Sequence, residues 1–211
     1  VAAIGGDRVL MLHQVPAEVR PAIEALWQVD AAMGDVVARA TQPALAAIKL
    51  AWWRDRLAEL DTGPAPAEPR LQAAAEHLLP ANVTGAELAA LEDGWVALLE
   101  EHVDAARVAE RGIKLFRLAA RLLGADETRT LEAGALYALV SVGRRGVPEL
   151  LDEAETYAPA LVRQRFPQPL RPLTALAKLA TRDLKQGAPF EIEGSPPRLA
   201  AMLRHQLTGR I

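Results

Sequence analysis

Apolar residues recur at helical spacing along almost the whole chain, and this pattern limits the fold more than any other feature. Within each segment they return every three or four residues, as one face of an α-helix requires. The clearest stripes are Leu45, Ile48 and Trp52; Leu50, Trp53, Leu57 and Leu60; Leu88, Leu91, Trp95 and Leu98; and Leu115, Leu118 and Leu122. Segments that could be strands are too short to build a sheet. The sequence therefore predicts an all-α protein of about eight to ten helices.

Glycine, proline and short polar residues mark where these helices begin and end. Residues 62–69 contain three prolines and a glycine and form the clearest loop. Thr84 stands three residues before Glu87, which predicts a capping box. Gly124 is expected to end one helix and Asp126 to cap the next. Because the segments on both sides of each break share one pattern, we expect a single domain over residues 1–211.

Composition narrows the classes of function. The net charge is −3, whereas nucleic-acid-binding domains usually carry a basic excess, so we expect no nucleic-acid partner. The chain has no cysteine, which excludes disulfides, thiolate metal sites and cysteine nucleophiles. No apolar run approaches the ~18 residues of a transmembrane helix. We therefore expect a cytoplasmic protein with at most peripheral contact with a membrane.

The histidines do not form a metal site by their spacing. They occur at positions 13, 77, 102 and 205, and none lies three or four residues from another, as two ligands on one helix face would. No nucleophile elbow, phosphate loop or dinucleotide-binding glycine pattern occurs either. We expect these histidines to be surface or capping residues.

Two aspartates in the first part of the chain are potential metal ligands by residue type. Asp30 and Asp35 are five residues apart, so on a helix they point about 140° away from each other. They cannot easily share one metal ion. We expect Asp35 to pair with Arg39, four residues further on, in an exposed ion pair.

A second acidic group has a more suitable spacing. Glu100, Glu101 and Asp104 lie within one helical turn of each other, so they are candidate metal ligands together with Asp35. The alternative interpretation is a solvated, charged face, because Arg107 and Arg111 follow closely.

The segment 42–57 reads Gln-Pro-Ala-Leu-Ala-Ala-Ile-Lys-Leu-Ala-Trp-Trp-Arg-Asp-Arg-Leu. It resembles the Glu-Pro-x-Leu-Gly-x-Ile-Arg-Leu-x-Trp-Trp-Arg-Asp-x-Leu segment of the squalene/phytoene synthase family. The family's opening Pro, Arg and Ala-Leu-aromatic positions are matched by Pro16, Arg20 and residues 25–27. The resemblance implies an isoprenoid-synthase-type helical bundle around a central cavity.

Active members of that family resemble one another in two aspartate-rich motifs that hold magnesium and a prenyl diphosphate. Aligned on the first motif, the chain has Gly34, Asp35 and Ala38, so one aspartate remains and Asp35 is the candidate catalytic residue. The positions aligned on the second motif are Ala138, Leu139, Ser141, Arg144 and Arg145. Its Gln, Asn and Asp are therefore replaced, with a cation where the metal ligand is expected.

The replaced aspartates make the resemblance closest to a non-catalytic branch of the family, which is associated with assembly of respiratory complex I. By resemblance, the candidate substrate-binding residues are Trp52, Trp53, Arg54 and Arg144. The tryptophans have a second interpretation as core residues, each contributing roughly 4–6 kcal/mol by burial. On a helix they point about 100° apart, so one could face a cavity while the other packs on a neighbour.

Three hypotheses follow. The first is a non-catalytic protein without cofactor that binds a prenyl diphosphate, an isoprenoid lipid or a protein partner. The second is an active magnesium-dependent prenyltransferase that condenses prenyl diphosphates in isoprenoid biosynthesis, with Asp35 and the 100–104 acidic group as metal ligands. The third is a helical interaction module without a ligand cavity. A cavity of at least ~300 Å³ lined by Trp52 or Trp53 would count against the third.

Overall fold

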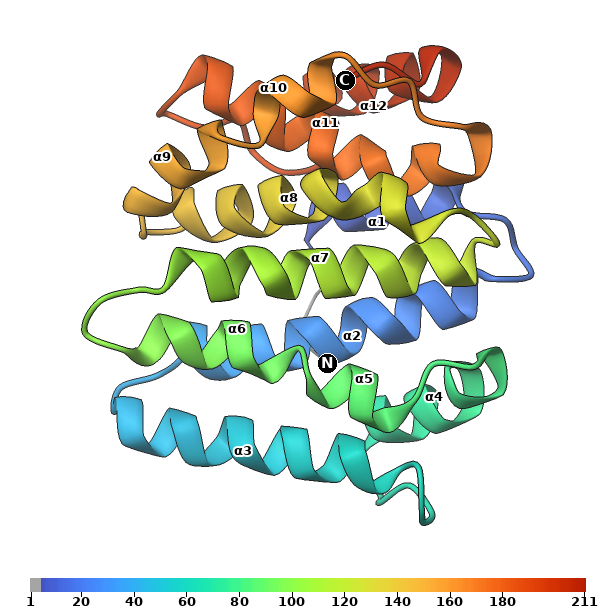
Figure 1. Ribbon diagram of the computed structural model, residues 1–211, viewed down its shortest axis with the longest axis vertical. Coiled ribbons are helices and arrows are strands. Elements are labelled where there is room, and N and C mark those ends of the chain that lie inside the picture. Colours follow the sequence, from blue (N-terminus) through green and yellow to red (C-terminus); the bar gives the residue numbers. More distant parts are fainter. Residues whose placement is uncertain (1–4) are drawn as a thin grey trace.

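The computed structural model describes residues 5–211 and is all-helical in that range, apart from one isolated bridge between Arg165 and Arg210 (Figure 1). The longer helices are α1 (Gly6–Gln14), α2 (Arg20–Ala38), α3 (Pro43–Glu59), α4 (Pro69–His77), α7 (Ala105–Leu122), α8 (Leu131–Gly143), α11 (Arg171–Gln186) and α12 (Pro196–Thr208). The short ones are α5 (Gly85–Ala89), α6 (Glu92–Val96), α9 (Glu149–Glu155), α10 (Ala158–Val162), η1 (Leu79–Ala81), η2 (Ala97–Leu99), η3 (Glu127–Thr130) and η4 (Gln168–Leu170). The all-α prediction is confirmed.

The helices stack in layers along the long axis of the molecule. Figure 1 shows α3 at one end, then α2 with α4, α5 and α6, then α7, then α8 with α1, and finally α10, α11 and α12. The α7 and α8 layers approach closely at Gly112 and Gly134. A Cβ added to Gly112 would lie 2.1 Å from the carbonyl oxygen of Gly134, so any side chain at this crossing would force the two helices apart.

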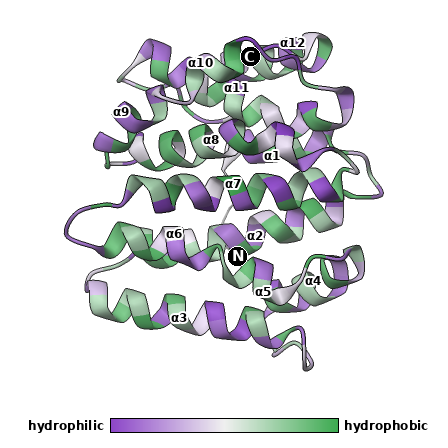
Figure 2. Ribbon diagram, in the orientation of Figure 1, coloured by the Kyte–Doolittle hydropathy of each residue, from purple (hydrophilic) through white to green (hydrophobic). Residues whose placement is uncertain are grey.

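The centre of the molecule is filled by aromatic side chains. Trp27 of α2 is fully buried, and its ring meets Phe116 of α7 and Tyr137 of α8 edge-on at centroid distances of 6.2 and 5.5 Å. Such edge-to-face pairs add to the stabilisation from burial alone. Figure 2 shows hydrophobic residues distributed through every layer, so one continuous core joins them.

Helix α3 differs from its sequence prediction. Leu50, Trp53, Leu57 and Leu60 are buried as expected, but the neighbouring stripe is not. Leu45, Ile48 and Trp52 are 51%, 66% and 44% exposed. One of the two apolar stripes of this helix is therefore not part of the core. Helix α3 forms the outer edge of the molecule and has a neighbour on one side only (Figure 1).

The local signals at helix ends were more reliable. The capping box of Thr84 and Glu87 is present at the start of α5, and Asp126 caps η3 through Thr128. Segment 85–99, which was read as one pattern, divides into α5, α6 and η2, so the chain has more helices than expected. Within residues 5–211, none of the helices has the length and hydropathy needed to span a bilayer.

Candidate functional site

A hollow of about 370 Å³ lies between the C-terminal half of α2 and the C-terminal end of α8. We call it the α2–α8 hollow. Its lining residues are Gly5 and Arg8; Ala31, Gly34, Asp35, Val37 and Ala38 of α2; Trp95 and Leu98; and Val142, Arg145 and Val147. This volume lies within the range of small-molecule sites, and the walls are mostly apolar with a few charged groups.

One wall of the hollow depends on a glycine. A Cβ on Gly34 would lie 2.8 Å from the six-membered ring of Trp95, so only glycine allows that indole to lie directly on α2. The indole nitrogen of Trp95 in turn donates a hydrogen bond of 3.0 Å to Asp30. Gly34 and Asp30 thus position Trp95 together.

Asp30 is the centre of a buried group of charges beneath this wall. Its carboxylate is fully buried, accepts a 2.6 Å hydrogen bond from Arg111 and lies 3.7 Å from Arg8. The Arg111 guanidinium also stacks on Trp95, 3.8 Å from the ring centroid. Three buried atoms in this group have no hydrogen-bond partner among the described residues, namely Oδ2 of Asp30 and Nε and Nη2 of Arg111. We call these residues the Asp30 network.

The hollow carries two cations that reach it from different helices. Arg8 of α1 is buried, and its Nε donates a 2.6 Å hydrogen bond to the hydroxyl of Tyr137. Burial acts to lower the pKa of Arg8, but Tyr137 and Asp30 outweigh it and the net shift is upward. Arg145, just after α8, is half-exposed and donates to Glu193 at 2.6 Å and to the carbonyl of Ser141 at 3.1 Å. One fixed and one more accessible positive charge therefore face the same space.

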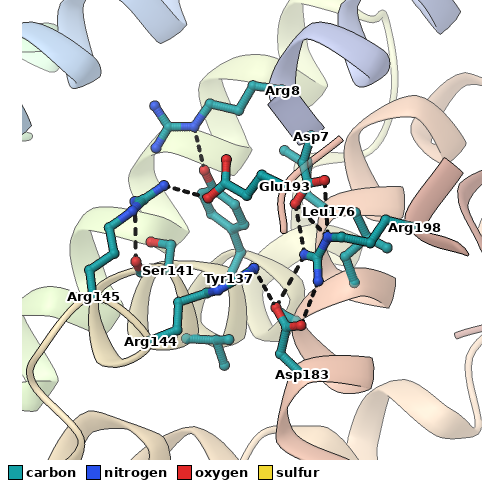
Figure 3. A pocket seen from close by; sticks show the side chains of 13 residues that line it. Asp7, Arg8, Tyr137, Ser141, Arg144, Arg145, Leu176, Asp183, Glu193 and Arg198 are labelled. Carbon is teal, nitrogen blue, oxygen red and sulfur yellow. Dashed lines mark hydrogen bonds and ion pairs between the residues drawn. The ribbon is translucent and has the colours of Figure 1, made fainter. Parts of the chain in front are cut away.

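A second buried group of charges connects α1, α11, α12 and the C-terminal end of α8, and Figure 3 shows it. Arg198 of α12 is held between Asp7 of α1 and Asp183 of α11, with contacts of 2.5–3.1 Å to both carboxylates. Asp183 also accepts a 2.8 Å hydrogen bond from Arg144. We call this chain of four residues the Arg198 network. The cavity beside it holds about 30 Å³, which is too small for an organic ligand.

Asp35, the candidate catalytic and metal-binding residue, lines the α2–α8 hollow. The expected ion pair with Arg39 is present at 3.8 Å. Asp35 also borders a second hollow of about 290 Å³ between α2 and α3, which Trp53 lines. This volume is about the ~300 Å³ expected of a ligand cavity lined by Trp52 or Trp53, so it does not separate a ligand-binding protein from a purely structural module.

The other metal candidates do not converge on Asp35. Asp104 caps α7 by accepting from the backbone of Ala106 and Arg107, Glu100 pairs with the Arg107 side chain, and Glu101 is exposed. Within residues 5–211, no group of three or more histidine or carboxylate side chains is placed to hold a metal ion.

The charged-face interpretation fits Glu100, Glu101 and Asp104. It is wrong for Arg111, which is 1% exposed, because the turn of α7 that carries this residue faces α2 and α6 rather than solvent.

The residues chosen by resemblance for substrate binding lie in three environments. Trp52 is on the exposed side of α3, so the core interpretation is wrong for it and correct for Trp53, which is 6% exposed. Arg54 pairs with Asp55 at the surface. Arg144 donates to Asp183 and to the carbonyl of Glu191. None of the four is among the residues that line the α2–α8 hollow.

The three positions aligned on the first aspartate-rich motif and one of the five aligned on the second line the same hollow. Gly34, Asp35 and Ala38 line the α2–α8 hollow from one side, and Arg145 lines it from the other. Spacing along the chain relates Asp30 only to Asp35, so the sequence does not predict the Asp30 network. Comparison with known proteins gives no match to any family model, curated protein or solved structure.

Proposed function

We propose that this protein is a non-catalytic, squalene/phytoene synthase-like binding protein whose α2–α8 hollow takes an amphiphile with an anionic head, such as a prenyl diphosphate or another anionic isoprenoid lipid. The observation that carries the proposal is the meeting of Arg8 and Arg145 with apolar residues of α2, η2 and α8 in one hollow. Cations suit the head of such a ligand, and apolar walls suit its chain.

The two arginines have complementary roles in this proposal. Arg8 is buried and fixed by Tyr137, so it offers a charge that is already oriented. Arg145 is half-exposed and pairs with Glu193, so a phosphate in the hollow would compete with that carboxylate for its guanidinium. The bidentate fork of arginine matches phosphate oxygens well. Glu193 would then act as the counter-ion of the empty site.

The same lining argues against catalysis. Departure of a diphosphate needs divalent cations to neutralise its developing charge, and magnesium prefers several oxygen ligands in near-octahedral geometry. Asp35 is the one carboxylate among the residues that line the hollow. These residues therefore do not fit a magnesium site. The active prenyltransferase remains the second candidate because Asp35 faces the hollow.

A role in assembling respiratory complexes, with a protein partner, rests on the resemblance alone. This role is compatible with a lipid-binding hollow, because a protein that does not transform its isoprenoid ligand could present it to a partner.

The direct test is binding of farnesyl diphosphate by calorimetry, with and without magnesium, beside farnesol and inorganic pyrophosphate. We expect farnesyl diphosphate to bind without magnesium and more tightly than either fragment, with no release of pyrophosphate. Ala38→Trp should fill the hollow and abolish binding, whereas Ala44→Trp on the exposed side of α3 should not.

Two outcomes would contradict the proposal. Pyrophosphate release that needs magnesium and is lost in Asp35→Ala would establish the prenyltransferase instead. Absence of binding by all three compounds, or equal binding by the Ala38→Trp and Ala44→Trp variants, would remove the hollow as a ligand site and favour the purely structural module.

A further inference from the structure

The C-terminal part of the chain has a net positive charge, whereas the whole chain has a net negative charge. Residues 163–211 contain nine lysines and arginines against three aspartates and glutamates, although the net charge of the chain is −3. The three acids are already engaged. Asp183 belongs to the Arg198 network, Glu191 pairs with Arg182, and Glu193 pairs with Arg145. The basic excess of this region is therefore not neutralised locally.

The uncompensated cations gather on α11 and α12. Within residues 5–211, no carboxylate lies within ion-pair distance of Lys178, Lys185 or Arg204. The pKa of Lys178 lies below its ordinary value, first because of partial burial and then because of the positive charges of Lys185, Arg204 and Arg182. These groups thus lie close enough to repel one another, and an anion placed among them would relieve the repulsion.

Exposed leucines stand beside these cations. Leu203 and Leu207 are one helical turn apart on α12 and are 50% and 81% exposed, and Arg204 lies next to them. The opposite side of α12 is firmly held, since Arg198, Met202 and His205 are buried. Helix α12 therefore has an anchored inner side and an outer side that presents apolar groups flanked by positive charge.

We propose that the outer side of α12, with Lys178 and Lys185 of α11 beside it, docks on an anionic lipid bilayer surface. A helix in the plane of the interface buries its apolar residues at the headgroup boundary while its cations meet anionic headgroups. The arrangement favours a bilayer over an acidic protein. Helix α12 lies in the end layer of the molecule (Figure 1), and its two leucines are exposed. A bilayer accepts such side chains without a matching groove.

This surface is independent of the α2–α8 hollow, whose lining includes no residue of α11 or α12. It differs from the exposed stripe of α3, where Arg54 and Arg56 pair with Asp55 and Glu59 and Lys49 is the one cation of the helix without an ion pair among the described residues. The α3 stripe is therefore a matched control with comparable apolar exposure and less free positive charge.

The test is co-sedimentation of the full chain with vesicles of phosphatidylglycerol and phosphatidylcholine, compared with phosphatidylcholine alone. We expect binding to the anionic vesicles, at least tenfold weaker binding to neutral ones, and strong weakening at high salt. Leu203→Ser with Leu207→Ser, and separately Arg204→Glu, should each reduce binding at least tenfold. The α3 pair Leu45→Ser with Ile48→Ser should leave it unchanged.

Circular dichroism and thermal unfolding of each variant would establish that it is folded. We expect folded variants, because the substituted side chains are exposed and contribute little to the core. The Ala38→Trp variant should still bind vesicles, which separates this surface from the ligand hollow. No binding to anionic vesicles, or equal loss in the α3 and α12 variants, would overturn the proposal. So would concentration-dependent self-association, measured by sedimentation velocity, that the α12 substitutions abolish.

Discussion

The two buried charge networks use similar residues but differ in how completely their polar atoms are paired. In the Arg198 network, one guanidinium meets two carboxylates, and none of the buried side-chain nitrogen or oxygen atoms of its described residues lacks a partner. In the Asp30 network, atoms of Asp30 and Arg111 are buried without a hydrogen bond. The first lies beside a cavity of about 30 Å³ and the second beside a hollow of about 370 Å³.

This difference distinguishes the Arg198 network, which stabilises the fold, from the Asp30 network, which borders the proposed ligand site. A fully paired buried network orients the helices that contribute to it, and removing one member exposes the others to the full cost of an unpaired buried charge. An incompletely paired network leaves buried polar atoms that can form further hydrogen bonds. Here these atoms belong to Asp30 and Arg111, which contact Trp95, and Trp95 forms a wall of the proposed ligand site.

The largest expected effect comes from opening the complete network. Arg198→Met removes the one cation between Asp7 and Asp183, so two buried carboxylates would lose their shared partner. We expect the free energy of unfolding to fall by about 3–5 kcal/mol in a denaturant titration. Arg204→Met, on the exposed side of the same helix, should change it by no more than ~0.5 kcal/mol. Similar values for the two variants would mean that the network contributes little.

A smaller loss is expected from the incomplete network. Asp30→Asn keeps the shape but removes the charge that faces Arg111 and Arg8. Because Arg111 also stacks on Trp95 and Arg8 also bonds Tyr137, we expect a loss of about 2–3 kcal/mol in the same titration. Binding of farnesyl diphosphate should weaken as well, whereas Arg198→Met should affect stability more than affinity. A larger stability loss in Asp30→Asn than in Arg198→Met would reverse the comparison.

Gly34→Ala tests the wall of the hollow. The added methyl group would meet the Trp95 ring at 2.8 Å, and overpacking of this kind costs about 1–3 kcal/mol. We expect a lower melting temperature and weaker ligand binding. In Gly63→Ala, the control, the new methyl would lie 3.8 Å from its nearest neighbour, so no comparable loss should appear. Unchanged binding by Gly34→Ala would show that Trp95 does not shape the site.

The smallest expected effect is a pH dependence of the free energy of unfolding. It arises from His205 of α12, the helix that also carries Arg198. The expectation of a surface histidine is wrong for His205, whose ring is buried. The ring bonds the carbonyl of Arg210 through Nδ1 and the hydroxyl of Thr174 through Nε2. Burial is the main cause that lowers its pKa below 6.5. The unfolded chain then takes up a proton before the folded one does, so stability is complete above pH 6.5 and falls as the pH drops below that value.

Between pH 7.5 and 5.5 we expect a loss of about 1 kcal/mol in the free energy of unfolding, measured in denaturant. His205→Gln should be less stable at pH 7.5 and nearly insensitive to this pH change. A wild-type stability that stays constant over the same range would show that His205 titrates normally in the folded state.

Local structure could be predicted from the sequence, but the site could not. Helical periodicity and the capping box of Thr84 depend on neighbours a few residues away, and both are present. Arg111 was placed on a solvated face because the residues around it are charged, but α7 turns it onto Trp95. Its partner Asp30 is 81 residues away, so no spacing within the sequence could reveal the pair.

The same limit applies to α3. Periodicity shows that one helix carries two apolar stripes, but it does not show which stripe has a neighbour. Exposure of Ile48 and Trp52 depends on the position of α3 at the end of the stack, and that position is set by all the other layers.

Helix α1 joins the two networks, because its adjacent residues Asp7 and Arg8 enter different ones. The contact from Asp7 to Arg198 spans 191 residues, and a loop of that length is closed at an entropic cost that local helices do not bear. Because α1 precedes α12 in the chain, the contact between Asp7 and Arg198 can form only after α12 has been synthesised. A chain stalled before α12 would therefore lack the link between the two networks, although Arg8 could already meet Tyr137 of α8.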